Sequence, residues 1–108
     1  MFKIEGKKIT LTRGDTFRAD IVITNADGTQ FNPGEDDTIT FTMRRTYSSA
    51  ILIQKTITDL VLEILPEDTA ELSYGSYVYD IELTYANGDV DTFIPKGTLV
   101  LTEEVTYA

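Results

Sequence analysis

Carboxylates are the side chains of this sequence best placed to do chemistry, and they form two groups. One is the run 35–37, Glu-Asp-Asp, and the other places Asp89 and Asp91 beside Asp80 and Glu82. Carboxylate oxygens bind calcium, and a pair of carboxylic acids can hydrolyse glycosides without histidine. Neither group has the spacing of a calcium loop, and a chain of this length has few residues with which to form a deep catalytic cleft. We therefore expect no catalytic residue, no metal site and no cofactor, with a calcium-stabilised surface module as one alternative.

The other reactive side chains are missing from the composition. The 108 residues include no Cys, His or Trp, which excludes Ser-His and Cys-His nucleophiles, histidine-ligated metals and disulfides. Nine Lys and Arg stand against 18 Asp and Glu, a net charge of -9. Such an excess of acid disfavours binding to phosphates or to an anionic lipid surface. We expect neither a nucleic acid nor a membrane as partner.

The elements that must position these groups are strands. The sequence is rich in Thr, Ile, Val, Tyr and Phe, which favour a pleated surface, and apolar side chains recur at every second position. The alternation predicts seven strands, at 8–12, 16–24, 38–44, 50–58, 60–64, 76–85 and 90–101. Pro66 followed by acidic residues predicts a helical turn near 66–72 that crosses between two sheets.

Turn residues fix the register of two hairpins. At Asp27-Gly28 we expect a three-residue loop with Gly28 left-handed, because it pairs Ile23 with Phe31 on the inner face. At Asn87-Gly88 we expect a two-residue turn that pairs Tyr85 with Val90 on the inner face. A bend or bulge is expected at 95–97, Pro-Lys-Gly. The inner faces predicted from the alternation contain Phe17, Ala19, Ile21, Ile23, Ile39, Phe41, Met43, Leu60, Leu62, Ile64, Tyr77, Tyr79, Ile81, Leu83, Tyr85, Leu99 and Leu101.

This pattern predicts an all-β fold. Its strand number, turn spacing and helical crossing before the longest strand fit an immunoglobulin-like antiparallel β-sandwich of about seven strands, which forms a single domain over residues 1–108. Met1 is followed by Phe-Lys-Ile-Glu with no apolar stretch, so we expect no signal peptide. The protein is then expected to be made in a cytoplasm and to stay soluble there.

Outward-facing apolar residues are the candidate interface. The predicted register turns Val22, Val78 and Phe93 outward, and Val61 and Leu65 are possible additions; a contiguous apolar group on one sheet is typical of a protein-binding surface. Exposed edge strands offer a second mode of docking, by addition of a strand.

Two further motifs have competing interpretations. Arg13-Gly14-Asp15 is a tripeptide that some cell-surface receptors bind, but its position between two strands is that of a turn. Aromatic rings can stack on sugars; we expect Tyr77, Tyr79 and Tyr85 to lie in the core. The alternative of a carbohydrate-binding module therefore rests on the surface aromatics Tyr47, Tyr74 and Phe93.

Several segments resemble, in order, small immunoglobulin-like domains of tailed phages and prophages, and in particular the N-terminal domain of upper baseplate proteins. The segments are 9–17 (ITLTRGDTF), 27–28 (DG), 62–72 (LEILPEDTAEL), 75–83 (GSYVYDIEL) and 97–101 (GTLVL). The resemblance implies a non-enzymatic virion structural protein that docks onto other tail or baseplate proteins, or onto copies of itself in a symmetric assembly. It also implies assembly in the host cytoplasm and a final location in the virion tail.

Overall fold

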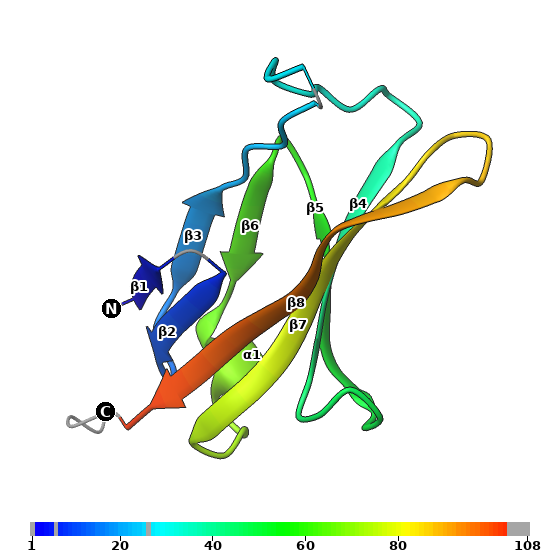
Figure 1. Ribbon diagram of the computed structural model, residues 1–108. Helices are drawn as coiled ribbons and strands as arrows, with labels where there is room; N and C mark the ends of the chain where they lie inside the picture. The colour runs from blue at the N-terminus through cyan, green and yellow to red at the C-terminus, as the bar shows by residue number, and fades with distance from the viewer. Residues whose placement is uncertain (1, 6, 26, 104–108) are drawn as a thin grey trace.

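The computed structural model describes residues 2–5, 7–25 and 27–103, and of residues 2–5 and 93–95 it describes the backbone alone (Figure 1). Eight strands and one short helix follow one another along the chain. They are β1 (Phe2–Glu5), β2 (Lys8–Thr12), β3 (Phe17–Asp20), β4 (Thr38–Arg44), β5 (Ile51–Ile57), β6 (Val61–Ile64), α1 (Pro66–Thr69), β7 (Gly75–Thr84) and β8 (Val90–Thr102).

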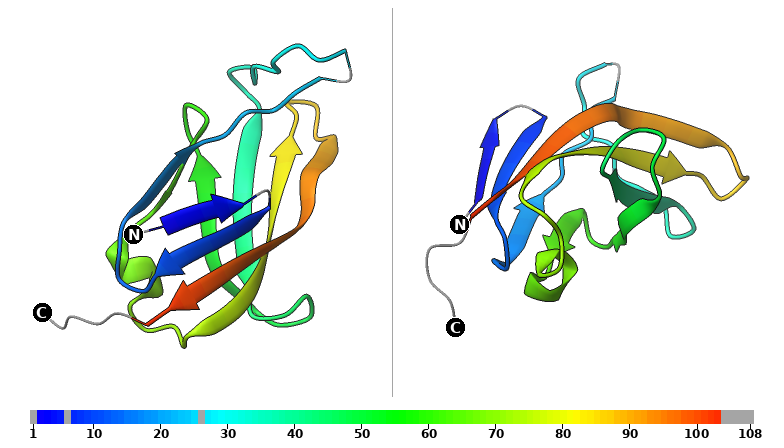
Figure 2. Two further views of the ribbon diagram at one scale, coloured as in Figure 1. Left: turned by 60° about the vertical axis from the view of Figure 1, so that its left-hand side comes forward. Right: turned by 90° about the horizontal axis from the view of Figure 1, so that it is seen from below.

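The strands form two layers. A six-stranded sheet has the order β1-β2-β8-β7-β4-β5, and a two-stranded sheet of β3 and β6 covers one of its faces (Figures 1 and 2). The chain changes layer between β5 and β6 through the turn 58–61, in which Asp59 and Leu60 have φ angles of 56° and 58°. The predicted all-β sandwich is confirmed.

The predicted purely antiparallel arrangement is wrong at one pair of strands. β2 and β8 run parallel, with Ile9 opposite Leu99 and Leu11 opposite Leu101. The described residues also form eight strands in place of about seven, because β1 pairs with β2 at the edge of the sheet. Alternation along a strand predicts on which face of the sheet each side chain lies, but not which strand lies next to it. The pairing of residues some 90 positions apart could therefore not be predicted from the sequence.

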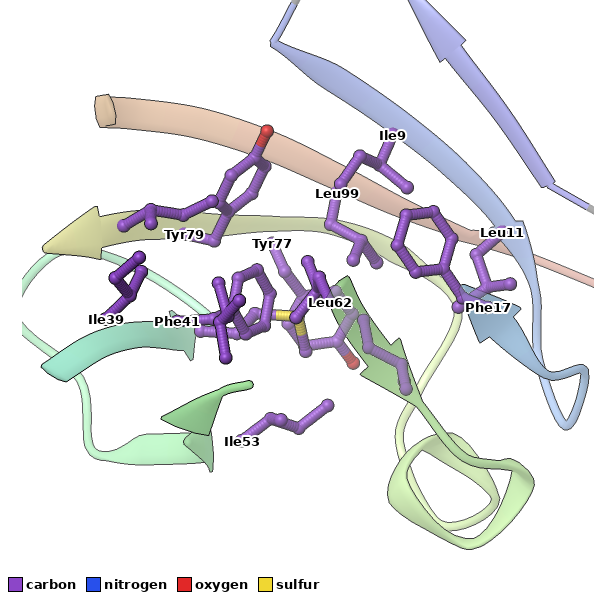
Figure 3. Close-up of a cluster of buried hydrophobic side chains, with 14 of the residues drawn as sticks. Ile9, Leu11, Phe17, Ile39, Phe41, Ile53, Leu62, Tyr77, Tyr79 and Leu99 are labelled. Atoms are coloured by element: carbon purple, nitrogen blue, oxygen red, sulfur yellow. The ribbon is translucent and has the colours of Figure 1, made fainter. Parts of the chain in front are cut away.

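The space between the layers is filled by the side chains that the alternation turned inward (Figure 3). The buried set is Ile9, Leu11, Phe17, Ile39, Phe41, Met43, Ile53, Ile57, Leu62, Ile64, Tyr77, Tyr79, Ile81, Leu83, Leu99 and Leu101. Ala19, Ile21, Ile23, Leu60 and Tyr85, which were also predicted to face inward, are partly buried and pack against this set. The predicted inner faces are therefore confirmed, and the core also contains four residues for which no inner face had been predicted: Ile9, Leu11, Ile53 and Ile57.

The two hairpins with Gly turns have the same construction. Asn25 N–H donates to Thr29 O, Thr24 bridges Gln30 and Gly28 has φ 91°, which confirms the predicted three-residue loop. Hydrogen bonds from the hydroxyl and N–H of Thr29 hold the pKa of the Asp27 carboxyl, at the tip of this loop, below its ordinary value.

The prediction for the second hairpin was wrong. Tyr85 N–H donates to Asp89 O and Gly88 has φ 94°, so the loop has three residues as well. The extra residue pairs Val90 with Thr84 in place of Tyr85. Because a shift of one residue turns a side chain to the opposite face, Val90 lies outside and is 58% exposed.

The crossing from β6 to β7 is fixed by partly buried polar contacts. The Asp68 carboxylate accepts the Leu65 N–H and lies 2.7 Å from Lys55 Nζ on β5. Thr69 is fully buried, and its hydroxyl accepts the N–H of Gly14 in the β2–β3 turn. At the start of β7, the Tyr77 hydroxyl donates to Ser73 O. These contacts join the helical turn to both layers.

Gly97 makes the closest approach between two strands. It lies opposite Tyr79, and a Cβ atom at this position would come within 2.2 Å of the Tyr79 ring. The ring also packs on Phe41, and its hydroxyl donates to Lys7 O at 2.9 Å. Between Gly97 and Asp91 the pairing with β7 shifts twice, where the bend at 95–97 was predicted. Glycine is therefore required at 97 for space.

We predict that Gly97→Ala lowers the free energy of unfolding by about 2–4 kcal/mol, because the Tyr79 ring must move and lose its packing. Denaturant unfolding measures this loss. The same substitution in a Tyr79→Leu background should cost less than half as much, while Thr98→Ala at the adjacent exposed position should be close to neutral. An equal cost in both backgrounds would show that the ring is not the cause.

Candidate functional site

The face of the six-stranded sheet that points away from β3 and β6 is not covered by the second layer. We call it the outer face. Its side chains alternate along the strands with the buried ones, and cross-strand pairing arranges them in rows. The rows are Lys8, Thr98, Val78 and Arg44; Thr10, Val100 and Ser76; Thr12 and Thr102; Asp80, Thr42 and Gln54; Thr92, Glu82, Thr40 and Thr56; and Val90, Thr84 and Thr38.

Threonine and valine dominate the outer face. Both are branched at Cβ, which restricts rotation about χ1, so they lose little conformational entropy when a partner covers them. Most of the central positions, among them Val78, Thr40 and Thr42, are already half-buried by their neighbours. A partner therefore meets a rigid surface of methyl and hydroxyl groups.

Tyr47 lies over the outer face from the turn between β4 and β5. It is 62% exposed and borders a shallow hollow of about 70 Å³ together with Val78, Thr42 and Asp80. Lys96 Nζ is 5.8 Å from the centre of the Tyr47 ring, which places Lys96 on the same face. An Arg44 guanidinium N–H donates to Ser49 O at 2.7 Å and holds the turn that carries the ring. The ring is an exposed aromatic anchor beside a cation.

The charged residues of the outer face are separated along the strands. Lys8 and Arg44 lie in the row of Val78, and Lys96 lies near Tyr47. Asp80 and Glu82 lie farther along β7, toward the β7–β8 hairpin. Among the described residues, neither carboxylate forms an ion pair. The outer face thus has Lys8 and Arg44 toward one end and Glu82 toward the other, with Asp80 and Lys96 between them.

The predicted interface residues do not form one patch. Val78 lies on the outer face, whereas Val22 follows β3 in the opposite layer and is 70% exposed. Phe93 lies in β8, but its side chain is outside the described part of the structure. Val61 and Leu65, in and after β6, are half-buried. Of the predicted residues whose side chains the structure describes, Val78 alone joins the outer face, where Val90 and Tyr47 accompany it.

The aromatic residues divide between core and surface. Tyr77 and Tyr79 are buried, although Tyr79 borders the hollow beside Tyr47. Tyr85 packs edge-on against Phe31, and both rings line a pocket of about 200 Å³. Tyr74 is half-buried beneath the Arg13 guanidinium, at 4.4 Å. Of the residues considered for stacking on a sugar, Tyr47 is the one with an exposed ring in the described part of the chain.

The carboxylate groups are dispersed in the structure. Asp37 accepts the N–H groups of Gly34 and Ala86 and so ties the 32–37 loop to the β7–β8 hairpin. The described residues contain no group of three or more acidic side chains arranged to hold a metal ion. An open groove of about 560 Å³ lies between 32–39 and 56–60, with no aromatic or cationic side chain in its lining.

The Arg13-Gly14-Asp15 segment forms the turn between β2 and β3. Gly14 has φ 84°, the Arg13 N–H donates to Thr102 O and the Asp15 N–H donates to Thr12 O. The Arg13 side chain also donates to Leu72 O. These bonds give each residue of the tripeptide a structural role.

Comparisons with known proteins find no match, whether to a protein family model, a curated protein or a solved structure. The resemblance to phage domains and the immunoglobulin-like assignment therefore stay predictions. Within the described part of the chain, no helix has the length and apolar character to span a membrane.

Tyr79, which also borders the hollow beside Tyr47, carries the buried titratable group of this region. Desolvation by burial raises the pKa of its hydroxyl above the ordinary value of 10.0. The folded protein then holds this proton at a pH where the unfolded chain has begun to lose it. The stabilisation is complete below the ordinary pKa and is lost as pH rises through the raised one.

We predict that the free energy of unfolding falls as pH rises above about 10, and that Tyr79→Phe makes this dependence shallower. Denaturant unfolding of both proteins between neutral and alkaline pH measures the two slopes. Tyr47→Phe removes a hydroxyl from an exposed ring and is the matched control, which should keep the slope of the parent. Parallel slopes for the parent and Tyr79→Phe would contradict the assignment.

Proposed function

We propose that this protein is a non-enzymatic structural component of a phage or prophage tail or baseplate, which docks onto neighbouring tail proteins through the outer face. The proposal joins two lines of support. The segment resemblance supplies the virion context, and the rigid, threonine-rich sheet face supplies a docking surface. It places the protein in the host cytoplasm during assembly and in the virion tail afterwards.

The composition of the outer face is the observation that carries the docking role. Protein interfaces are poor in charged residues at their centre and rich in aromatic anchors. Tyr47, Val78 and Thr42 lie together around the hollow, and one charged residue of each sign, Arg44 and Asp80, borders it as well. A partner that covers this centre must offer a cation or a hydrogen-bond donor to Asp80, because burying an unpaired carboxylate is costly.

The absence of enzymatic activity is part of the proposal and is supported by side-chain chemistry. The sequence has no histidine or cysteine to serve as base or nucleophile. Its carboxylates lie at the surface or bind backbone N–H groups, as Asp37 and Asp68 do. A raised carboxyl pKa of the kind that acid catalysis uses would require a deeper site.

Strand order supports an immunoglobulin-like scaffold for this role. In the large sheet β7 is next to β4, and β4 is next to the edge strand β5. The second layer contains β3 and β6. Immunoglobulin-like domains have a tyrosine corner near the start of strand F. The helical crossing and the hydrogen bond from the Tyr77 hydroxyl to Ser73 O lie at the corresponding point of this chain, near the start of β7. Scaffolds of this type present whole sheet faces to partners.

We predict that tail or baseplate proteins encoded beside this gene are captured by the purified protein, and that Val78→Lys weakens capture at least about tenfold by placing a charge at the centre of the outer face. Val22→Lys is the matched control, since it adds the same charge to an exposed valine of the other layer. Thermal melting checks that both variants fold. Capture of none of these proteins, or equal loss with both variants, would reject the proposal.

A carbohydrate-binding module is the second candidate, and the exposed Tyr47 ring is the observation that favours it. The ring stands beside Lys96 and Asp80, so that a sugar stacked on it would meet hydrogen-bonding groups at its edge. This function would use the same part of the outer face.

For this second candidate we predict that a glycan array gives binding that Tyr47→Ala abolishes and Tyr47→Phe retains, because stacking needs the ring and not its hydroxyl. Tyr74→Phe, at the half-buried ring, serves as a control for the array signal. An array without signal for the parent protein would exclude this function.

A further inference from the structure

The carboxylate of Asp91 points to the inner side of the six-stranded sheet, where charged groups are rare. Asp91 lies opposite Leu83 in the pairing of β8 with β7, so both side chains are on the same face, and Leu83 is buried there. The predicted two-residue turn would have placed Asp91 opposite Thr84, on the outer face; the third residue of the loop turns it inward. In the described part of the chain, the Asp91 side chain makes no hydrogen bond or ion pair.

A pocket of about 200 Å³ lies beside this carboxylate, between the hairpin that contains Ile23 and Phe31 and the hairpin that joins β7 to β8 (Figure 2). Phe31 and Tyr85 form a corner of the pocket, with their ring planes at 84° and their ring centroids 6.4 Å apart. Ile23 and Leu83 add aliphatic surface. The volume is below the roughly 300–1,000 Å³ of pockets that enclose drug-sized ligands, so the pocket suits a single side chain.

The lining of the pocket selects a cation on an apolar stem. A guanidinium or ammonium group is attracted both to the face of an aromatic ring and to a carboxylate, and this pocket offers the two together. Arginine fits better than lysine, because its planar guanidinium can stack on a ring while it donates two hydrogen bonds to Asp91. Thr24 and Asn25 complete the lining with side-chain oxygens that can accept further hydrogen bonds.

The charge around the pocket favours the same ligand. The loops 25–37 and 85–91, which flank the pocket, contain acids and no Lys or Arg. A cation is therefore attracted to this end of the protein. An anionic ligand is repelled, and so is a second copy of this chain, whose net charge is -9. The partner that this pocket fits is a protein that presents a basic side chain.

We propose that the pocket formed by Ile23, Phe31, Leu83, Tyr85 and Asp91 binds an arginine side chain of a partner protein. The guanidinium pairs with Asp91 and stacks in the aromatic corner, and the aliphatic stem lies on the apolar surface below it. The pocket is on the inner side of β7 and β8, away from the outer face. The inference therefore goes beyond the proposed docking through the outer face and does not depend on it.

Capped amino acids test the chemistry of the pocket. Arginine with acetyl and methylamide caps is titrated into the isotope-labelled protein, and binding is followed by NMR. It should shift amide signals of residues 23–25, 31 and 83–91 with a dissociation constant on the order of millimolar. Capped citrulline, which has the same shape without the charge, should bind at least about fivefold more weakly, and capped glutamate should not bind. Free arginine should also bind more weakly than the capped form, because its carboxylate would meet the acidic loops.

Two variants separate the pocket from the net charge. Asp91→Asn should weaken binding of capped arginine at least about tenfold, because the pocket keeps its shape and loses its charge. Asp89→Asn is the matched control, since it makes the same change in net charge two residues away and outside the lining, and it should bind like the parent. Thermal melting checks folding, and Asp91→Asn should melt no lower than the parent, because Asp91 has no partner to lose.

Three results would overturn the proposal. One is the absence of signal shifts with capped arginine at millimolar concentrations, and another is an equal loss of binding in the two variants. The third is tighter binding of free arginine than of the capped form, which would make the pocket a site for a small molecule and not for a side chain of a protein. Capture of tail proteins through Val78 is measured separately, so failure of this inference is distinguishable from failure of the proposed function.

Discussion

The contact between the Tyr79 ring and Gly97 is the constraint on which the arrangement of the sheet depends. The ring occupies the space of an absent Cβ, packs on Phe41 and anchors to Lys7 O. Since β7 and β8 are held at this point, the two register shifts between Gly97 and Asp91 must be absorbed by β8. The shifts decide which β8 side chains reach the outer face. The same contact that closes the core thus determines the composition of the candidate docking surface.

Each strand of the large sheet serves two surfaces at once. In β4 the residues Ile39, Phe41 and Met43 are buried, while the threonines between them lie on the outer face. The buried apolar side chains contribute most of the favourable free energy of folding. The threonines on the outer face are branched at Cβ and so favour the strand conformation, and they add no charge. A surface strand that served only solubility would carry Lys and Glu at these positions. The threonines keep the face soluble when free and require little desolvation when covered.

Sequence reasoning predicted the parts of this structure that depend on local rules. β2 and β4 have the predicted bounds, the core residues face inward and Gly28 forms its three-residue loop. Sequence reasoning failed where the structure depends on the pairing of distant segments or on one extra residue in a turn. The parallel pairing of β2 with β8 and the outward position of Val90 have no local signal. Of the candidate interface, Val78 lies on the outer face and Val22 does not, because alternation gives a side of a strand without identifying its layer.

The distribution of charge connects folding with assembly. The acidic loops 25–37, 58–60 and 85–91 lie at one end of the sandwich, where Asp37 binds the Ala86 N–H and lines the groove with Asp59 (Figure 1). Repulsion between such ends keeps free copies apart at long range, but it is screened over about 8 Å at physiological salt. The outer face lies along the sheet and away from the tips of these loops. Within the screening distance the charges of each contact surface decide the interaction, so the excess of acid controls solubility while the local surface controls which contacts form.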